Sequence, residues 1–149
     1  MTSEANPEIT EIKSLIITND NYEEYKDKLS SQTEKLIVES INLSEKSFKI
    51  TNCEIKRGEL TKCEISLIND SELTNIKFND CKDLKINKSK FTDSEFIVSQ
   101  ISEFNEVNIL YSKLINCQKF NISNSILEKS ELMAMHLNTP RKNLKTIKK

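Results

Sequence analysis

An internal 18-residue repeat constrains the fold of this chain more than any other feature of its sequence. The segments FKITNCEIKRGEL (48–60), LKINKSKFTDSEF (84–96) and FNISNSILEKSEL (120–132) align at a 36-residue shift, and halving the shift keeps the register. Large apolar residues then fill three columns, which are Ile50, Ile68, Ile86, Phe104 and Ile122; Ile55, Leu73, Phe91, Ile109 and Leu127; and Leu60, Phe78, Phe96, Leu114 and Leu132. Self-similarity at a fixed period is the signature of a repeat architecture.

The spacing inside each repeat predicts how the chain folds. A small residue precedes most of the large residues of the second and third columns by two positions, as Cys53 precedes Ile55 and Ser94 precedes Phe96. The inward positions advance by steps of five, five, three and five, which fits neither a helix nor a long β-hairpin. We therefore predict an all-β fold, a parallel β-solenoid with 18-residue coils. Its successive coils pair as parallel strands ~4.8 Å apart.

Glycine and proline are too scarce for a turn-rich sandwich or barrel, since the chain has one glycine and two prolines. Other residues must therefore form the corners of the coils.

Two outward columns support the same register. Thr51, Asn69, Asn87, Asn105 and Ser123 predict a polar ladder at a corner. A second column alternates in sign and consists of Glu59, Lys77, Glu95, Lys113 and Glu131. Stacking in register would bring like charges together without this alternation, so it favours pairing along the solenoid.

The repeat divides the chain into three parts. We expect an N-terminal strand and capping helix in residues 1–39, a β-solenoid of five to six coils in 40–139 and a basic flexible tail in 140–149. The helix should begin at Tyr22, with Asp20 or Asn21 as its cap, because such residues accept hydrogen bonds from the first free N–H groups.

The small-x-large units that step by five positions resemble those of pentapeptide-repeat proteins. They are clearest in CEIKRGELTKCEI (53–65), SKFTDSEFIVSQI (89–101) and SILEKSEL (125–132), and the resemblance covers about 53–137. The chain departs from that family in two ways. One side of the coil is shortened to a step of three residues, and the residue before the large apolar one is Glu or Lys, where the family often has Asp or Asn.

A second, shorter resemblance is to the β-helix of cyclase-associated proteins and tubulin-folding cofactor C. It rests on IKFNDCKDLKI (76–86) and SKLINCQKFNI (112–122), and a counterpart of the cofactor's Gln-x-Arg motif is missing. Both resemblances imply a right-handed β-helix.

Charge and cysteine usage limit the compartment and the partners. The net charge is −1, and residues 40–139 carry fourteen acidic against thirteen basic residues. We find no apolar run of membrane-spanning length and no secretory leader. The four cysteines lack CxxC spacing, which favours a reducing compartment. We therefore expect a cytoplasmic protein without a membrane span, which contacts nucleic acid, if at all, through its basic tail.

The residues that could carry chemistry are explained by structure. Cys63, Cys81 and Cys117 share a column with Ser99, and stacking along an axis does not give the convergent tetrahedral array that zinc requires. We interpret them as small core residues. His136 has no acid or nucleophile placed beside it by the repeat. We therefore expect no catalytic residue, no cofactor and no metal, and we do not expect an enzyme.

An apolar stripe among the outward columns suggests a contact surface. The column Thr61, Asn79, Ile97, Ile115, Met133 becomes apolar in its C-terminal half, and Val98, Leu110 and Tyr111 fall in adjacent outward columns. Exposed apolar stripes mark contact surfaces. We therefore expect a non-enzymatic protein-interaction or assembly module with a protein partner, and a homodimer through this stripe. Two alternatives remain open: a module that binds actin or tubulin monomers, as the second resemblance implies, and an acidic-face DNA mimic that acts on a topoisomerase, as known for some pentapeptide-repeat proteins.

Overall fold

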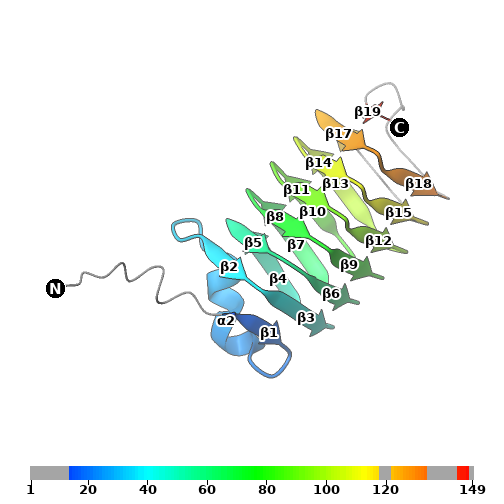
Figure 1. Ribbon diagram of the computed structural model, residues 1–149. Coiled ribbons are helices and arrows are strands. Elements are labelled where there is room, and N and C mark those ends of the chain that lie inside the picture. Colours follow the sequence, from blue (N-terminus) through cyan, green and yellow to red (C-terminus); the bar gives the residue numbers. More distant parts are fainter. Residues whose placement is uncertain (1–13, 118–121, 134–143, 148–149) are drawn as a thin grey trace.

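The protein is a parallel β-solenoid with about five coils (Figure 1). Between Cys53 and Met133 most strand partners in neighbouring coils lie one 18-residue repeat apart, as the sequence predicts. The computed structural model describes residues 14–117 and 122–133 and, for the backbone alone, 144–147. The strands stack in register along one axis, and each coil passes through three sheets in turn.

Three parallel sheets form the sides of the solenoid. Sheet I contains β1 (Ile16–Thr18), β3 (Ser40–Ser44), β6 (Gly58–Thr61), β9 (Ile76–Asn79), β12 (Glu95–Ile97), β15 (Lys113–Ile115) and β18 (Glu131–Met133). Sheet II contains β4 (Ser47–Thr51), β7 (Glu64–Asn69), β10 (Leu84–Asn87), β13 (Ile101–Asn105) and β16 (Ile122–Ser123). Sheet III contains β2 (Leu36–Val38), β5 (Cys53–Ile55), β8 (Glu72–Thr74), β11 (Lys90–Thr92), β14 (Asn108–Leu110), β17 (Ser125–Glu128) and β19 (Leu144–Ile147).

The three apolar columns form the core. Fourteen of the fifteen residues are buried, and Leu132 in the last described rung of sheet I is half-buried against them. Phenylalanine rings fill the middle coils: Phe78 and Phe96 stack with centroids 4.5 Å apart, and Phe91 meets Phe96 edge-on at 5.2 Å. Stacking one large side chain on another at every rung keeps the interior dry over the length of the solenoid.

The corners are formed by residues in the left-handed conformation. Fifteen non-glycine residues of the described chain have φ between 49° and 59°, and eight of them are Asn or Asp, which tolerate this conformation best. At the corner between sheets II and III they recur once in every coil and are Asn52, Asp70, Lys88, Glu106 and Asn124. This explains how the chain turns with a single glycine.

The residue after a left-handed position usually points inward and is most often Ser or Cys, whereas Lys46, which follows Glu45, lies at the surface. The inward Ser or Cys side chain donates a hydrogen bond to the carbonyl two residues earlier, as Ser89 Oγ does to Asn87 O at 2.8 Å. A serine hydroxyl also accepts from the backbone N–H one coil before, as Ser89 does from Ser71 N at 3.2 Å. The small inward residues of the repeat therefore pair backbone groups that the corners would otherwise leave unpaired and buried.

Alternate strands of sheet II carry a β-bulge. Phe48 pairs with Ile65, whereas Ile50 pairs with Ile68, so the separation of the partners along the chain grows by one residue between the two pairs. The same shift occurs between β10 and β13, where Leu84 pairs with Ile101. Flat and bulged strands alternate, so the same strand shape returns at every second coil.

A short helix takes the place of a sheet II strand in the first coil. Helix α2 (Tyr22–Leu29) lies against β4, burying Tyr22 and Leu29. The Tyr22 hydroxyl donates to the Ser47 carbonyl at 2.8 Å, and its ring meets Phe48 edge-on. The helix thus covers that end of sheet II, where β4 would otherwise present an open edge.

The predicted helix start is confirmed, but its cap differs from the expectation. Asn21 occupies the N-cap position without a side-chain hydrogen bond to the helix. Its amide instead accepts from Thr18 N at 2.8 Å and donates to Ile16 O at 2.9 Å, so it stabilises the turn between β1 and the helix.

Strands at both ends extend beyond the predicted solenoid of 40–139. β1 and β2 pair in parallel with β3 and β5, so the N-terminal segment supplies the first rung of sheets I and III. Within the segment predicted as a flexible tail, β19 pairs in parallel with β17. Strand pairing of this kind satisfies the edge of β17, which a tail in solution would leave open.

Candidate functional surfaces

The predicted apolar stripe forms a continuous line at one edge of sheet I. Ile97, Ile115 and Met133 end β12, β15 and β18, and they are partners in consecutive rungs. Val98 follows Ile97 at the corner and is 48% exposed, Met133 is 46% exposed, and both isoleucines are half-buried. We call Ile97, Val98, Ile115 and Met133 the apolar edge.

Val98 has an unfavourable backbone conformation for its side chain. Its φ is 52°, whereas β-branched residues rarely occupy the left-handed region. The equivalent residues one coil away are Asp80 and Asn116, which suit this conformation better. An exposed apolar side chain at a strained position costs stability, which is a reason to examine it for function.

Leu110 and Tyr111 lie apart from the apolar edge. Leu110 ends β14 in sheet III, and Tyr111 forms the corner between sheets III and I. Ile115 lies at the far end of β15, so the length of that strand separates it from both residues. Tyr111 is 53% exposed, and the Lys129 amine donates to its hydroxyl at 3.3 Å and lies over its ring. The sequence predicts adjacent columns because it shows distance along the chain but not the corner between strands.

The alternating charges stand in register on the outer face of sheet I, beside the apolar edge. We call Glu59, Lys77, Glu95, Lys113 and Glu131 the charge column. Within the described residues, no two of its members come within the 4.0 Å of an ion pair. The expected register is therefore present, but the expected pairing along the solenoid is not.

The polar column at the end of the sheet II strands is also in register. Ser123 Oγ donates to Asn105 Oδ1 at 3.0 Å, which is a ladder bond of the predicted kind. Asn69 instead donates to the neighbouring Asp70, and Asn87 Oδ1 is buried without a hydrogen-bond partner among the residues that the structure describes. The column thus forms coil-to-coil bonds at one of its ends.

The four cysteines are free and buried in the corners. Each thiol donates to backbone carbonyls, as Cys117 does to Phe96 O at 3.3 Å. Burial raises the pKa of Cys53 to about 11 and also raises the pKa of Cys117. Cys63 and Cys81 share a hydrogen bond between neighbouring rungs, which lowers the pKa of Cys63 and, with burial, raises that of Cys81.

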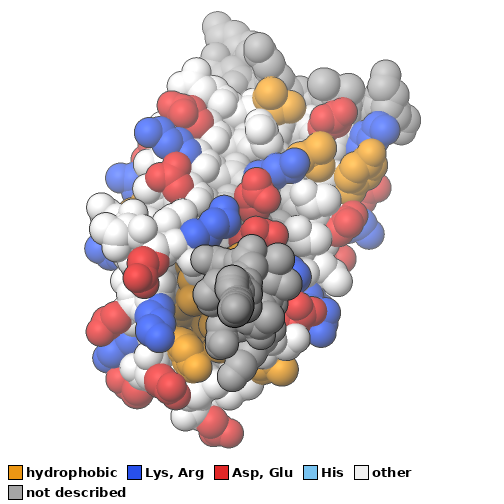
Figure 2. Space-filling view, turned by 60° about the vertical axis from the view of Figure 1, so that its left-hand side comes forward, with side chains coloured by type: hydrophobic (Ala, Val, Ile, Leu, Met, Phe, Trp, Pro, Cys, Tyr) orange, Lys and Arg blue, Asp and Glu red, His pale blue; other side chains and the backbone are white. Residues whose placement is uncertain are grey.

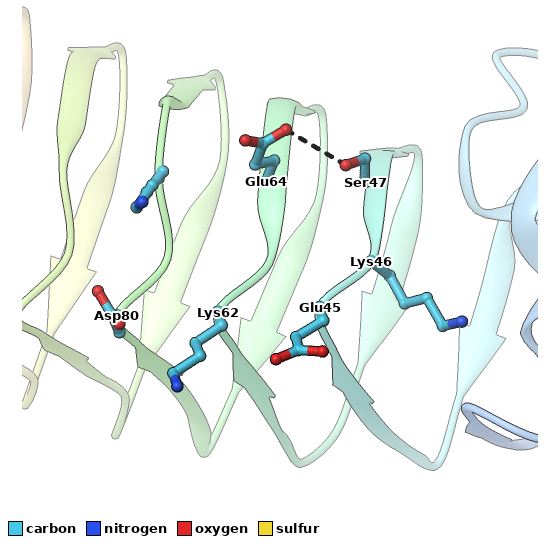
Figure 3. A pocket seen from close by; sticks show the side chains of 7 residues that line it. Glu45, Lys46, Ser47, Lys62, Glu64 and Asp80 are labelled. Atoms are coloured by element: carbon cyan, nitrogen blue, oxygen red, sulfur yellow. Dashed lines mark hydrogen bonds between the residues drawn. The ribbon is translucent and has the colours of Figure 1, made fainter.

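A hollow of about 520 Å³ lies on the surface above the Cys63 corner (Figure 3). Three lysines and three acidic residues line it with Ser47, and they are Lys46, Lys62, Lys82, Glu45, Glu64 and Asp80. Lys46 and Lys62 extend in opposite directions in Figure 3, and the Lys46 amine lies over the Tyr22 ring. The charges therefore do not converge on one point, as a binding site for a small ligand would require.

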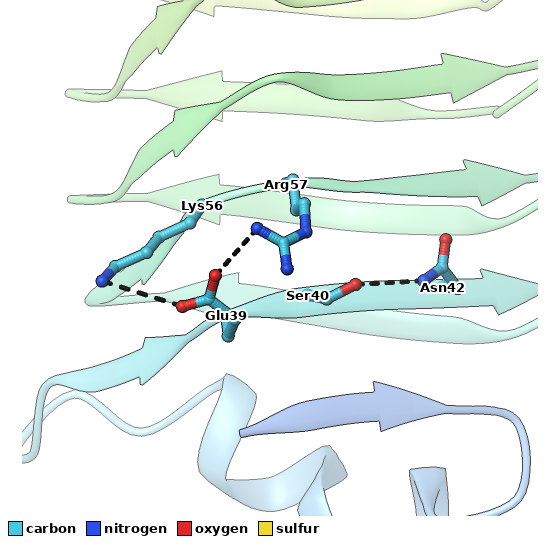
Figure 4. A network of polar contacts seen from close by, with 5 residues as sticks. All are labelled: Glu39, Ser40, Asn42, Lys56 and Arg57. Atoms are coloured by element: carbon cyan, nitrogen blue, oxygen red, sulfur yellow. Dashed lines mark hydrogen bonds and ion pairs between the residues drawn. The ribbon is translucent and has the colours of Figure 1, made fainter. Parts of the chain in front are cut away.

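A polar network joins the first two coils (Figure 4). Glu39 accepts from Arg57 at 2.8 Å and lies 3.8 Å from the Lys56 amine, and Asn42 donates to Ser40 nearby. Exposed ion pairs of this kind contribute little to stability. We interpret these ion pairs as contacts that hold the first corner in place, and not as a catalytic or binding site.

Three exposed apolar residues could not be identified from the repeat columns of the sequence. Ile16 is 50% exposed in β1, and Ile37 in β2 is 48% exposed. Ile126 in β17 is 36% exposed and belongs to the same outward column of sheet III as Ile37. Charged or polar residues occupy the rungs between them, so the column gave no apolar signal.

Other sites are absent from the described part of the chain. Among these residues, no group of three or more His, Cys, Asp and Glu side chains could hold a metal ion, and no helix is long and apolar enough to cross a membrane. His136 lies outside the described residues. Figure 2 shows charged side chains of both signs interspersed over one face.

No protein-family model matches the chain, and a search of curated proteins also found no match.

Proposed function

We propose that this protein is a non-enzymatic binding module that uses the outer face of sheet I to contact a protein partner. The observation that carries the proposal is Val98, an exposed β-branched residue in the left-handed conformation at the apolar edge. Corners of this solenoid are otherwise often Asn or Asp, so Val98 costs stability that an ordinary corner would keep. A contact that buries Val98 with Ile115 and Met133 offsets this cost.

The fold that carries this function is a right-handed, pentapeptide-repeat-like β-helix of a cytoplasmic protein. Right-handedness is supported by the strong preference of crossovers between parallel strands for that hand. The small inward residues and the five-position step support the likeness to pentapeptide repeats, and four free cysteines support a reducing compartment.

A module that binds cytoskeletal monomers is a second candidate. Its support is that Cys81 and Cys117, the residues central to the likeness to cyclase-associated proteins, occupy equivalent positions at the corner between sheets I and II. The apolar edge follows the same corner, so a partner bound there would contact the segments that carry the likeness.

Capture of partners by matched variants tests the proposal. The double variant Ile97→Glu, Ile115→Glu places charge on the apolar edge, and Lys90→Glu, Asn108→Glu changes the exposed face of sheet III instead. We expect a protein that is retained by the wild type and the sheet III variant but lost by the apolar-edge variant. Actin or tubulin would support the second candidate, and a topoisomerase would support DNA mimicry. Equal retention by all three proteins contradicts the use of sheet I.

A further inference from the structure

The charge column and the apolar edge together describe a surface that is complementary to itself. Both lie on the outer face of sheet I, one column apart along each strand. The charges alternate at every rung, from Glu59 through Lys113 to Glu131, and form no ion pair within the described chain. Charges that are unpaired inside one molecule remain available for contacts with another.

Two symmetric arrangements can bring this face against a second copy. If the two-fold axis follows the solenoid axis, each rung meets the same rung of the second copy. This axis also reverses the strand direction. The charge column then either meets itself, with Glu95 on Glu95 and Lys113 on Lys113, or lies over the apolar edge of the second copy. The first case places like charges together at every rung and the second buries charges without partners, so this arrangement is disfavoured.

The other two-fold axis runs along the strands and reverses the order of the rungs. If it lies between β12 and β15, Glu95 faces Lys113 of the second copy, and Lys77 faces Glu131. The same rotation brings Ile97 against Ile115 of the second copy, because strand positions are preserved. Shifting the axis onto β15 would pair Lys113 with itself and Glu95 with Glu131, so the alternation requires an axis between two strands. The apolar edge selects among these axes. Between β9 and β12, Ile97 would face Asn79, and between β15 and β18 only two described strands would overlap.

We propose that the chain forms an antiparallel homodimer through sheet I, with the two-fold axis between β12 and β15. This deepens the proposed function, because it takes the outer face of sheet I as the contact surface and identifies a second copy as its partner. With this axis, β9, β12, β15 and β18 of the two copies overlap, an area of about 20 Å by about 15 Å, which is below the roughly 800 Å² per partner of a typical stable interface. The dimer is therefore weak, with a dissociation constant of roughly 10–100 μM, and weakens further as salt screens its charges.

Charge reversal at two positions tests both the partner and the register. Lys113→Glu makes Glu95, residue 113 and Glu131 all negative, and Glu95→Lys makes Lys77, residue 95 and Lys113 all positive. Each variant alone would place like charges across the axis, and we expect dimerisation of the full chain to weaken about tenfold or more in sedimentation equilibrium. A mixture of the two variants would pair opposite charges across the axis, and we expect it to form a heterodimer as strong as the wild-type dimer.

The controls separate this inference from the proposed function. Lys90→Glu changes the net charge as Lys113→Glu does, but on sheet III, and should dimerise like the wild type. A wild type that stays monomeric at about 100 μM overturns the homodimer. So does a mixture that associates no better than its components. Neither result affects the capture experiment, which detects any partner of the apolar edge.

Discussion

The two corners that flank sheet I solve the same geometric problem with different side chains. At the corner between sheets III and I, serine hydroxyls link consecutive coils, as Ser94 N donates to Ser112 Oγ and Ser112 N donates to Ser130 Oγ, both at 3.0 Å. At the corner between sheets I and II, the inward residues are Cys63, Cys81 and Cys117, and a serine occurs only at Ser99 among the described rungs that follow Cys63.

The difference lies in how well each side chain accepts a hydrogen bond. A hydroxyl donates to one backbone carbonyl and accepts from an N–H, whereas a thiol donates and accepts weakly. The serine corner is therefore held by bonds in both directions. The cysteine corner depends more on packing, and it is also the corner at which the apolar edge and the hollow lie. The less firmly bonded corner thus carries the surface that we propose for binding.

The largest expected effect concerns the one rung of the serine corner that has no side chain. A Cβ added at Gly58 would overlap the Ile41 carbonyl oxygen in β3 and lie 2.8 Å from its Cγ2. We expect Gly58→Ala to lower the free energy of unfolding by about 3 kcal/mol or more, measured by urea titration. Asn108→Ala, on the exposed face of sheet III, is the control and should cost little. A cost below about 1 kcal/mol for Gly58→Ala would mean that the corner can widen.

Alkaline pH should destabilise the protein through its buried thiols, whereas the serine corners should not respond to it. The pKa of Cys53 is about 11 in the folded protein, against an ordinary value of 9.0, because burial disfavours the thiolate. The unfolded chain therefore releases this proton first. The resulting stability is fully present below pH 9 and is lost as pH rises through about 11, a loss of up to about 3 kcal/mol.

Cys53→Ser is the matched variant, because Ser71 and Ser89 occupy the same position in the next coils. Its free energy of unfolding should fall less between pH 8 and pH 11 than that of the wild type. Urea titrations at both pH values measure the difference. Parallel losses in the two proteins would show that the Cys53 thiol is not protected in the folded state.

Removing a hydroxyl should cost more than removing a thiol at the same corner. Ser99 Oγ accepts from Cys81 N at 3.1 Å, and its one proton has two acceptors within reach, the Ile97 carbonyl at 3.1 Å and the Phe78 carbonyl at 3.3 Å. Ser99→Ala leaves that N–H buried and unpaired, which we expect to cost about 1–3 kcal/mol. Cys117→Ala should cost less, since the thiol forms weaker bonds. Urea titration ranks the two, and the reverse order would contradict our account of the corners.

Much of the fold was predictable because the repeat shows the core directly. Columns such as Phe78 and Phe96 are apolar at every rung, so side-chain chemistry alone gives the register. The bulges of sheet II could not be predicted from the apolar columns, because column residues such as Ile50 and Ile68 keep their 18-residue spacing across the bulge.

The corners and the surface were less predictable. Left-handed residues such as Lys62 and Val98 carry no composition signal, since Lys and Val are ordinary strand or surface residues. The apolar edge was found from its column, whereas Leu110 and Tyr111 were grouped with it wrongly in space, because corners redirect neighbouring columns to different sheets. A surface depends on where corners lie, and the sequence shows only how often they recur.

The substitution with the smallest expected effect tests whether Val98, at the cysteine corner, is a strained residue. Val98→Asn places a residue that tolerates the left-handed conformation at φ 52°, and we expect it to raise the free energy of unfolding by about 1 kcal/mol. The reverse change one coil later, Asn116→Val, should lower it by a similar amount. Urea titration measures both. If Val98→Asn does not stabilise the protein, then the valine is not strained and its conformation does not mark the apolar edge as a contact surface. If it stabilises the protein while partner capture falls, the stability given up at this corner serves binding.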